Sequence, residues 1–188
     1  MPSARGARAG GAHRVRIIGG AWRSRVIRFA PRAAVRPTPD RVRETLFNWL
    51  GQDLSGATCL DLYAGSGALG FEAASRGARR VVMVERDPSI YRFLLDTRAM
   101  LDATAVEVVK ADALEFLKGD SGRYDVVFLD PPFETANWPR LLGPLPARMN
   151  PGGQIYCESA APLEIPAGWE IRKQGRAGHV CYQLLQQA

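Results

Sequence analysis

Residues 61–70 read DLYAGSGALG, and this stretch decides the fold. It follows Thr58-Cys59-Leu60, an apolar run typical of a buried strand, and a helical pattern begins at Leu69. Gly65 and Gly67 permit backbone conformations that other side chains would block, so a ligand can approach the main chain there. A strand, a glycine-rich turn and a helix in this order favour a nucleotide-binding βαβ unit.

The chain beyond residue 57 repeats this alternation of short apolar runs and helical patterns. Because strands that alternate with helices form right-handed βαβ units, we expect an α/β fold with a mostly parallel sheet covered on both faces. The patterns predict strands at 58–60, 80–84, 106–109, 126–129 and 153–157, helices at 69–76, 88–101, 113–118 and 138–148, and a closing antiparallel hairpin at 169–173 and 179–185.

The N-terminal segment is organised differently. Residues 14–30 have the strand, glycine-rich turn and strand pattern of a β-hairpin, and the proline-flanked residues 31–37 are expected to be a linker. A helix should follow, with Thr38 as the N-cap, Pro39 at the first helical position and its end at Gly51.

The charge of the chain is unevenly distributed around a net value of +6. Residues 1–43 contain eleven arginines, no lysine and one acid, Asp40, which gives a net charge of +10. Residues 44–188 hold fourteen basic and eighteen acidic residues, a net charge of −4. Arginine presents a planar fork that matches phosphate and stacks on bases, so its exclusive use between apolar residues favours nucleic acid as the partner.

Composition disfavours membranes, metals and secretion. No apolar run approaches the ~18 residues of a membrane-spanning helix, and the N-terminus lacks the apolar region of a secretory signal. The cysteines Cys59, Cys157 and Cys181 lack C-x-x-C spacing, so we expect reduced thiols, buried for the first two, and a cytoplasmic location. His13 and His179 have no partner at ligand spacing, and no metal site is expected.

Four carboxylates fall at the expected strand ends: Asp61, Glu85, Asp112 and Asp130. In doubly wound folds the ligand lies along these ends. Residues 65–70 match the dinucleotide fingerprint G-x-G-x-x-G, but the acids would repel a pyrophosphate. S-adenosylmethionine carries a sulfonium and an ammonium against one carboxylate, and therefore suits an acidic rim. Glu85 could accept hydrogen bonds from the ribose hydroxyls, and Asp112 could accept one from the adenine amino group.

The run Tyr124–Leu129 ends in Asp130-Pro131-Pro132-Phe133. Each proline fixes φ and lacks an N–H, which predicts a rigid, extended turn with outward carbonyl groups. Asp130 and the Pro131 carbonyl can each accept one hydrogen of a planar –NH2 group, and Phe133 can stack on the attached ring. The turn therefore predicts a site for the exocyclic amine of a base.

Two N-terminal blocks carry a family resemblance. Residues 16–23, RIIGGAWR, and 36–50, RPTPDRVRETLFNWL, resemble the small-subunit ribosomal RNA guanine-N2 methyltransferase family, and the motifs at 61–70 and 130–133 agree. The resemblance covers roughly residues 14–186, and only the first ten residues and Pro39 depart from it. It implies a Rossmann-like class I methyltransferase with a seven-stranded, mostly parallel sheet, S-adenosylmethionine as donor and a guanine of 16S rRNA as acceptor.

The resemblance also implies roles for residues. The expected cofactor-binding residues are Asp61, Tyr63, Ala64, Gly65, Ser66, Gly67, Glu85, Arg86, Asp112 and Ala113. The expected catalytic residues are Asp130, Pro131, Pro132 and Phe133. The arginine-rich N-terminal segment itself is expected to bind RNA, through Arg14, Arg16, Trp22, Arg23, Arg36, Thr38, Arg41 and Arg43. We divide the chain into a flexible basic arm at 1–13, an RNA-binding hairpin and linker at 14–37 and a methyltransferase domain at 38–188. A monomer acting on 16S rRNA or the assembled small subunit is expected.

Three other functions stay open. An adenine-N6 or other exocyclic-amine methyltransferase would use the same turn at 130–133, and only the N-terminal block argues against it. An NAD-dependent oxidoreductase fits the glycine spacing but not the acidic rim. A non-catalytic RNA-binding protein fits the arginines but leaves the acidic strand ends unexplained.

Overall fold

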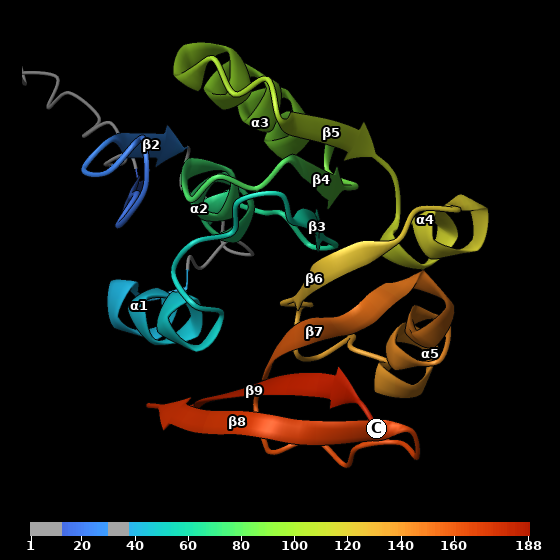
Figure 1. Ribbon diagram of the computed structural model, residues 1–188. Coiled ribbons are helices and arrows are strands. Elements are labelled where there is room, and N and C mark those ends of the chain that lie inside the picture. The colour runs from blue at the N-terminus through green and yellow to red at the C-terminus, as the bar shows by residue number, and fades with distance from the viewer. Residues whose placement is uncertain (1–12, 30–37) are drawn as a thin grey trace, which may run out of the picture.

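One seven-stranded sheet organises the molecule (Figure 1). The computed structural model describes residues 13–29 and 38–188. The strands lie in the order β5-β4-β3-β6-β7-β9-β8. They are β3 (Thr58–Asp61), β4 (Arg80–Glu85), β5 (Val106–Lys110), β6 (Tyr124–Leu129), β7 (Met149–Ser159), β8 (Trp169–Ala177) and β9 (Val180–Gln187). Neighbours from β5 to β7 are parallel and β9 is antiparallel to β7 and β8, so the predicted fold is confirmed.

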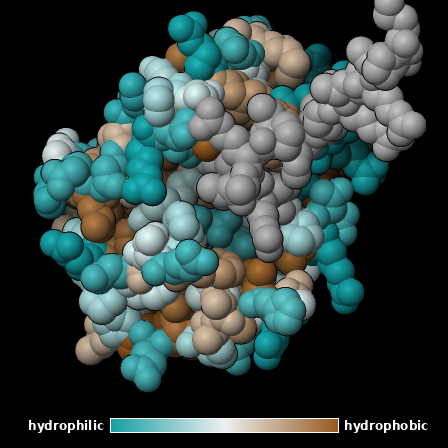
Figure 2. All heavy atoms as spheres, turned by 180° about the vertical axis from the view of Figure 1, so that it is seen from behind, coloured by the Kyte–Doolittle hydropathy of each residue, from teal (hydrophilic) through white to brown (hydrophobic). Residues whose placement is uncertain are grey.

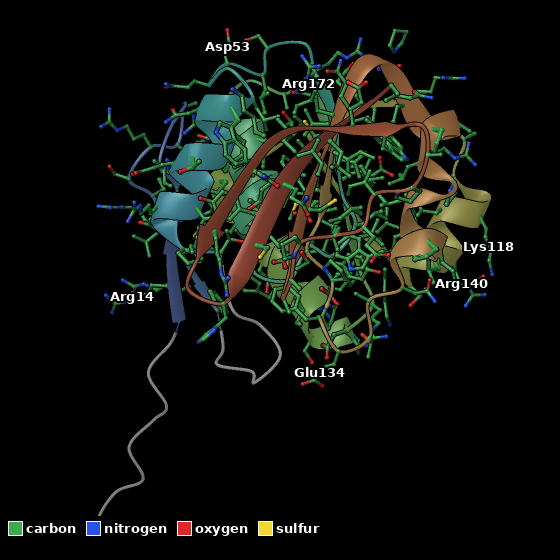
Figure 3. The ribbon with its side chains drawn as sticks, turned by 90° about the horizontal axis from the view of Figure 1, so that it is seen from below. Arg14, Asp53, Lys118, Glu134, Arg140 and Arg172 are labelled. Carbon is green, nitrogen blue, oxygen red and sulfur yellow. The ribbon has the colours of Figure 1, made fainter. Side chains whose placement is uncertain are left out.

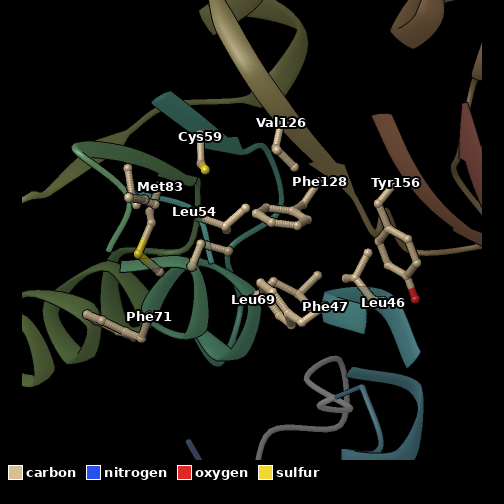
Figure 4. Close-up of a cluster of buried hydrophobic side chains, with 14 of the residues drawn as sticks. Leu46, Phe47, Leu54, Cys59, Leu69, Phe71, Met83, Val126, Phe128 and Tyr156 are labelled. Carbon is tan, nitrogen blue, oxygen red and sulfur yellow. The ribbon is translucent and has the colours of Figure 1, made fainter. Parts of the chain in front are cut away.

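Helices cover both faces of the sheet, and alternate residues of each strand face opposite sides. On one face, Phe47 and Phe128 of β6 pack with ring centroids 6.1 Å apart, in the cluster that Figure 4 shows. On the other face, Val127 of β6 lies in a cluster with Leu117 and Leu142. The first face carries α1 (Asp40–Trp49), α2 (Ala68–Ser75) and α3 (Pro88–Leu101), and the second carries α4 (Ala113–Gly119), α5 (Trp138–Leu142) and the 3-10 helix η1 (Leu145–Arg148).

Two of the predicted helices differ from the structure in their N-cap or in their continuity. Helix α1 begins at Asp40 with Pro39 as its N-cap residue, so the prediction of Thr38 as N-cap is wrong by one position. The helix expected at 138–148 is divided into α5 and η1, because Pro144 has no N–H to continue an α-helix.

The N-terminal hairpin packs into the same core as the sheet. Strands β1 (His13–Arg16) and β2 (Val26–Phe29) pair antiparallel, as predicted. Ile17 and Ile27 are fully buried in the cluster formed around α1 and α2. Removing the hairpin would therefore expose the core. The predicted linker at 31–37 and the predicted arm, apart from its last residue, lie outside the described residues.

A buried carboxylate joins the hairpin to two helices. Glu72 of α2 is fully buried and accepts the backbone N–H groups of Ile18 and Gly19, both at 2.8 Å. Its other partners are Arg76 Nε at 2.9 Å and Arg43 Nη1 at 3.5 Å. A buried charge is stable only when it is paired and hydrogen-bonded, so these donors fix the hairpin, α1 and α2 as one unit.

The surface is polar with small apolar patches. Figure 2 shows hydrophilic side chains spread between hydrophobic patches on the face seen from behind. The exposed large hydrophobic side chains among the described residues are scattered over different parts of the chain: Val26, Met100, Phe133 and Ile171. Within residues 13–29 and 38–188, no helix has the length and apolar character needed to cross a membrane.

Replacing Glu72 by glutamine should destabilise the whole fold. The amide keeps the size of the side chain but loses the charge and one acceptor oxygen, which removes the buried counter-charge of Arg43 and Arg76 and leaves at least one backbone N–H without its acceptor. We expect the free energy of unfolding, measured by urea denaturation, to fall by about 3 kcal/mol or more. The control is Glu115→Gln, which breaks an exposed pair with Lys118 and should leave that free energy nearly unchanged. Equal effects of the two substitutions would contradict the role given to Glu72.

Candidate active site

The sheet brings the four predicted acids to one edge. In strand order they are Asp112 after β5, Glu85 at the end of β4, Asp61 at the end of β3 and Asp130 after β6. Because these strands are parallel, their carboxyl ends meet at the same edge. Ligands of open α/β sheets bind at this edge, so the acids mark the candidate site.

Two of these acids hold the glycine loop in place. Gly65 has a φ of 49° and Gly67 a φ of 77°, a region that favours glycine. Glu85 accepts the backbone N–H of Gly65 at 3.1 Å, and its other oxygen accepts a second backbone N–H at 2.8 Å. Asp61 accepts the N–H of Gly70 at 3.1 Å. A carboxylate offers about four acceptor positions, so Glu85 keeps capacity for ligand hydroxyls.

The inner acids lack a compensating cation. Burial raises the pKa of Asp61 to about 7, against backbone hydrogen bonds from Gly70 and Tyr63 that lower it. Burial raises the pKa of Asp130 well above its usual range, and the carboxylates of Glu158 and Asp61 raise it further. No arginine or lysine of the described ranges forms an ion pair with these acids. A positively charged ligand would stabilise their ionised forms.

The outer part of the edge is more exposed. Asp112 caps α4 by accepting the N–H of Leu114 at 2.9 Å through Oδ1, which leaves Oδ2 for a ligand. Arg86 Nη1 lies 4.0 Å from that Oδ2. Tyr63 is half-buried, and burial raises the pKa of its hydroxyl, with a further rise from Asp112. The other predicted cofactor residues with side chains, Ala64, Ser66 and Ala113, are buried.

A fifth acid, missing from the sequence prediction, extends the row. Glu158 lies in β7, level with Asp130 in the parallel register of β6 and β7, and is only 3% exposed. Its Oε1 accepts the hydroxyl of Thr38 at 2.7 Å and that of Tyr156 at 2.9 Å. The signal for it was present, since Glu158 follows the strand expected at 153–157 just as the other acids follow theirs.

The turn after β6 places an acid beside an exposed ring. Pro131 is buried, and no described residue donates a hydrogen bond to its carbonyl oxygen. The Pro132 carbonyl accepts the N–H of Thr135 at 3.1 Å, which closes the turn. Phe133 is 39% exposed. The Asp130 carboxylate, the Pro131 carbonyl and the Phe133 ring thus come from four consecutive residues, with acceptors and ring available to a ligand.

Most predicted RNA-binding arginines are exposed. Arg14, Arg16 and Arg23 lie on the hairpin and Arg41 lies on α1. Figure 3 shows Arg14 extending outward from the hairpin. The predicted residue Trp22 is half-buried against the core, and Arg36 lies outside the described residues.

The structure corrects the prediction for Arg43 and Thr38. Arg43 is 0% exposed and donates to Asp40 Oδ1 at 2.6 Å and to Glu72, so it cannot contact RNA. Thr38 is buried and gives its hydroxyl to Glu158. Their place in the block that carries the family resemblance therefore reflects packing and positioning.

A cleft of about 770 Å³ lies at the opposite, amino-terminal end of the strands. Its lining includes Arg79, Arg98 and Arg123, each of which already donates to an oxygen atom of the protein. It contains none of the predicted site residues. The acids at the carboxyl edge, and not this cleft, define the candidate site.

Known proteins resemble this chain over nearly its whole length. The family model described as conserved hypothetical protein 95 matches residues 15–186. An Escherichia coli relative named ribosomal RNA small subunit methyltransferase D is 39% identical over 181 residues, 94% of this chain and 91% of the relative. A Haemophilus influenzae relative of the same name is 39% identical, covering 92% and 93%. A solved structure described as a putative methyltransferase from Escherichia coli gives a TM-score of 0.83 at 40% identity, covering 93% of this chain and 98% of that one.

Proposed function

The chain belongs to the conserved hypothetical protein 95 family, and we propose that it transfers a methyl group from S-adenosylmethionine to the exocyclic N2 amine of a guanine in 16S rRNA. The observation that carries this proposal is the row of acids that ends at the Asp130–Phe133 turn. The name of the relatives supports small-subunit rRNA as substrate, and the block at 36–50 supports guanine N2.

All the acids of the row come from one chain, so we propose that the protein acts as a monomer. We also propose that it acts in the cytoplasm, where ribosomal subunits are found.

The acidic edge fits a cationic methyl donor. When bound, S-adenosylmethionine supplies an electrophilic methyl group on a sulfonium, and the sulfur keeps the electron pair of the broken bond. Glu85 would accept the ribose hydroxyls, and Asp112 Oδ2 the adenine amino group. Asp61 and the backbone at Gly65 and Gly67 would complete the cradle. A dinucleotide would instead place its pyrophosphate against these carboxylates, which disfavours the NAD alternative.

The turn after β6 would hold and activate the base. The lone pair of guanine N2 is delocalised into the ring, which makes it a poor nucleophile. Hydrogen bonds from its two hydrogens to Asp130 and the Pro131 carbonyl favour a pyramidal nitrogen and orient the lone pair, while Phe133 stacks on the ring. Asp130 stabilises the positive charge that grows on nitrogen, and after transfer the methylated nitrogen loses one of its two protons to water. The base must be unpaired or flipped to reach this turn.

Nucleoside analysis tests the function directly. The protein is incubated with labelled S-adenosylmethionine and either small ribosomal subunits that lack the modification or free 16S rRNA. We expect label in N2-methylguanosine. Label in N6-methyladenosine would replace this proposal with the alternative base, and no transfer to either substrate would contradict it.

Asp130→Asn should abolish most methyl transfer while retaining cofactor binding. The amide keeps the shape of the side chain, but it loses the charge and one acceptor. We expect turnover to fall by about 100-fold or more, with the dissociation constant for S-adenosylmethionine nearly unchanged in titration calorimetry. Glu85→Gln tests the cofactor site instead, and this substitution should mainly weaken the binding of S-adenosylmethionine. Turnover of the Asp130 variant within about threefold of the original protein would refute the proposed contact with the amine.

Arg41→Ala should weaken RNA binding through the loss of one phosphate contact. The slope of log affinity against log salt concentration should become shallower by about 0.7 to 0.9. Arg140→Ala removes the same charge from an exposed side chain on α5, across the sheet from α1, and should leave the slope unchanged. Figure 3 shows Arg140 pointing outward far from Arg14 of the hairpin. If both variants alter the slope equally, α1 is not a specific RNA contact.

A further inference from the structure

Glu158 is a buried acid at the catalytic turn to which the mechanism above gives no role. Leu129 pairs with Cys157 in the parallel register of β6 and β7, so the next residue of each chain segment, Asp130 and Glu158, lies at the same level. Glu158 has almost no contact with solvent. The negative charge of Glu158 raises the pKa of Asp130. The two carboxylates cannot both be ionised without a cost in free energy, because like charges repel strongly where water is excluded.

Two hydroxyl groups decide which acid of the pair keeps the negative charge. Thr38 and Tyr156 both donate to Glu158 Oε1, and such donors favour the ionised carboxylate. No hydrogen bond lowers the pKa of Asp130. Figure 4 shows Tyr156 beside Leu46, its ring reaching from the sheet toward α1. The arrangement therefore places the charge on Glu158 and leaves the proton of the pair on Asp130.

The groups that face this pair supply no direct positive charge. Asp61 of β3 faces Asp130 and raises its pKa. Tyr182 of β9 stands opposite Glu158 in the register of β7 and β9. On the α1 side, Arg43 donates through Nε to the backbone carbonyl of Thr38 at 3.2 Å and directs its Nη2 atom to Arg16 and Asp40. Burial also raises the pKa of Glu158, and its two hydroxyl partners oppose that rise.

We propose that Glu158 is a positioning residue for methyl transfer. It stays ionised between Thr38 and Tyr156 and thereby keeps the proton of the acid pair on Asp130. Through Thr38 it also holds the start of α1 against the catalytic turn. This inference rests on the proposed function and deepens it. A positive charge bound at the acidic edge favours release of that proton. Asp130 thus becomes an acceptor for the amine hydrogens when a cation occupies the edge.

The test is a titration of the free protein, which needs neither cofactor nor RNA. Glu158→Gln retains the shape and an oxygen that can accept both hydroxyls, but removes the charge. The midpoint of the Asp130 carboxyl resonance, followed by carbon-13 NMR against pH, should fall by about one pH unit or more. Glu170→Gln removes an exposed acid on β8 and should leave that midpoint in place. An unchanged Asp130 midpoint in folded Glu158→Gln protein would overturn the proposal.

A second variant tests the proposal independently, in case the Glu158→Gln protein does not fold. Tyr156→Phe removes one donor to Glu158 and no charge, so the proton of the pair should move toward Glu158 and the Asp130 midpoint should again fall. A purely structural role for the Tyr156 hydroxyl would lower stability and leave the midpoint where it was, and this result would overturn the proposal as well.

The pH profile of methyl transfer separates this inference from the proposed function. If Asp130 must be ionised, the rate rises with pH, and in Glu158→Gln the rise should occur at lower pH, by the same amount as the NMR midpoint. A profile that does not move, with transfer intact, would refute the role of Glu158 and leave the function standing. Absence of any transfer by the original protein would refute the function, whereas the shift of the NMR midpoint would still establish the coupling of the two acids.

Discussion

The buried Glu72 carboxylate is the interaction on which the arrangement of the molecule depends. It is satisfied only when the hairpin supplies two backbone N–H groups and α1 and α2 supply their arginines, Arg43 and Arg76. Helix α2 begins directly after the glycine loop, so the same carboxylate fixes the path of that loop relative to the hairpin. The same buried carboxylate therefore joins the arginine-bearing hairpin to the helix that follows the glycine loop.

The acids at the carboxyl edge of the sheet lower the stability of the fold at neutral pH. Asp61 has a folded-state pKa of about 7 against an ordinary value of 3.8, so the folded protein binds its proton more tightly than the unfolded chain does. The stabilising effect of that proton is complete at pH values below the ordinary pKa and disappears as the pH rises through the folded value. Asp130 and Glu158 have raised pKa values for the same reason, burial. A cationic ligand explains why a fold would retain acids that disfavour it at neutral pH.

Features that depend on residues close together in the sequence could be predicted, and features that depend on residues far apart in the sequence could not. The strands, the hairpin and the row of acids follow from local patterns, because a parallel sheet brings every strand end to one edge. Arg43 and Thr38 were assigned to RNA because their partners, Glu72 and Glu158, lie 29 and 120 residues away. No local pattern shows that such an arginine is buried. Glu158 itself was missed although it directly follows the strand expected at 153–157, because the same local signal was used only for the four strands before it.

Strand β9 lies between β7 and β8, so β8 joins the sheet only through a strand that follows it in the chain. The same strand covers the end of β7, where Tyr182 stands opposite Glu158. A nascent chain that lacks β9 would leave Glu158 in water and Asp130 without a close, desolvated neighbour. The rise that Glu158 causes in the pKa of Asp130 would thus be acquired only when β9 pairs with β7.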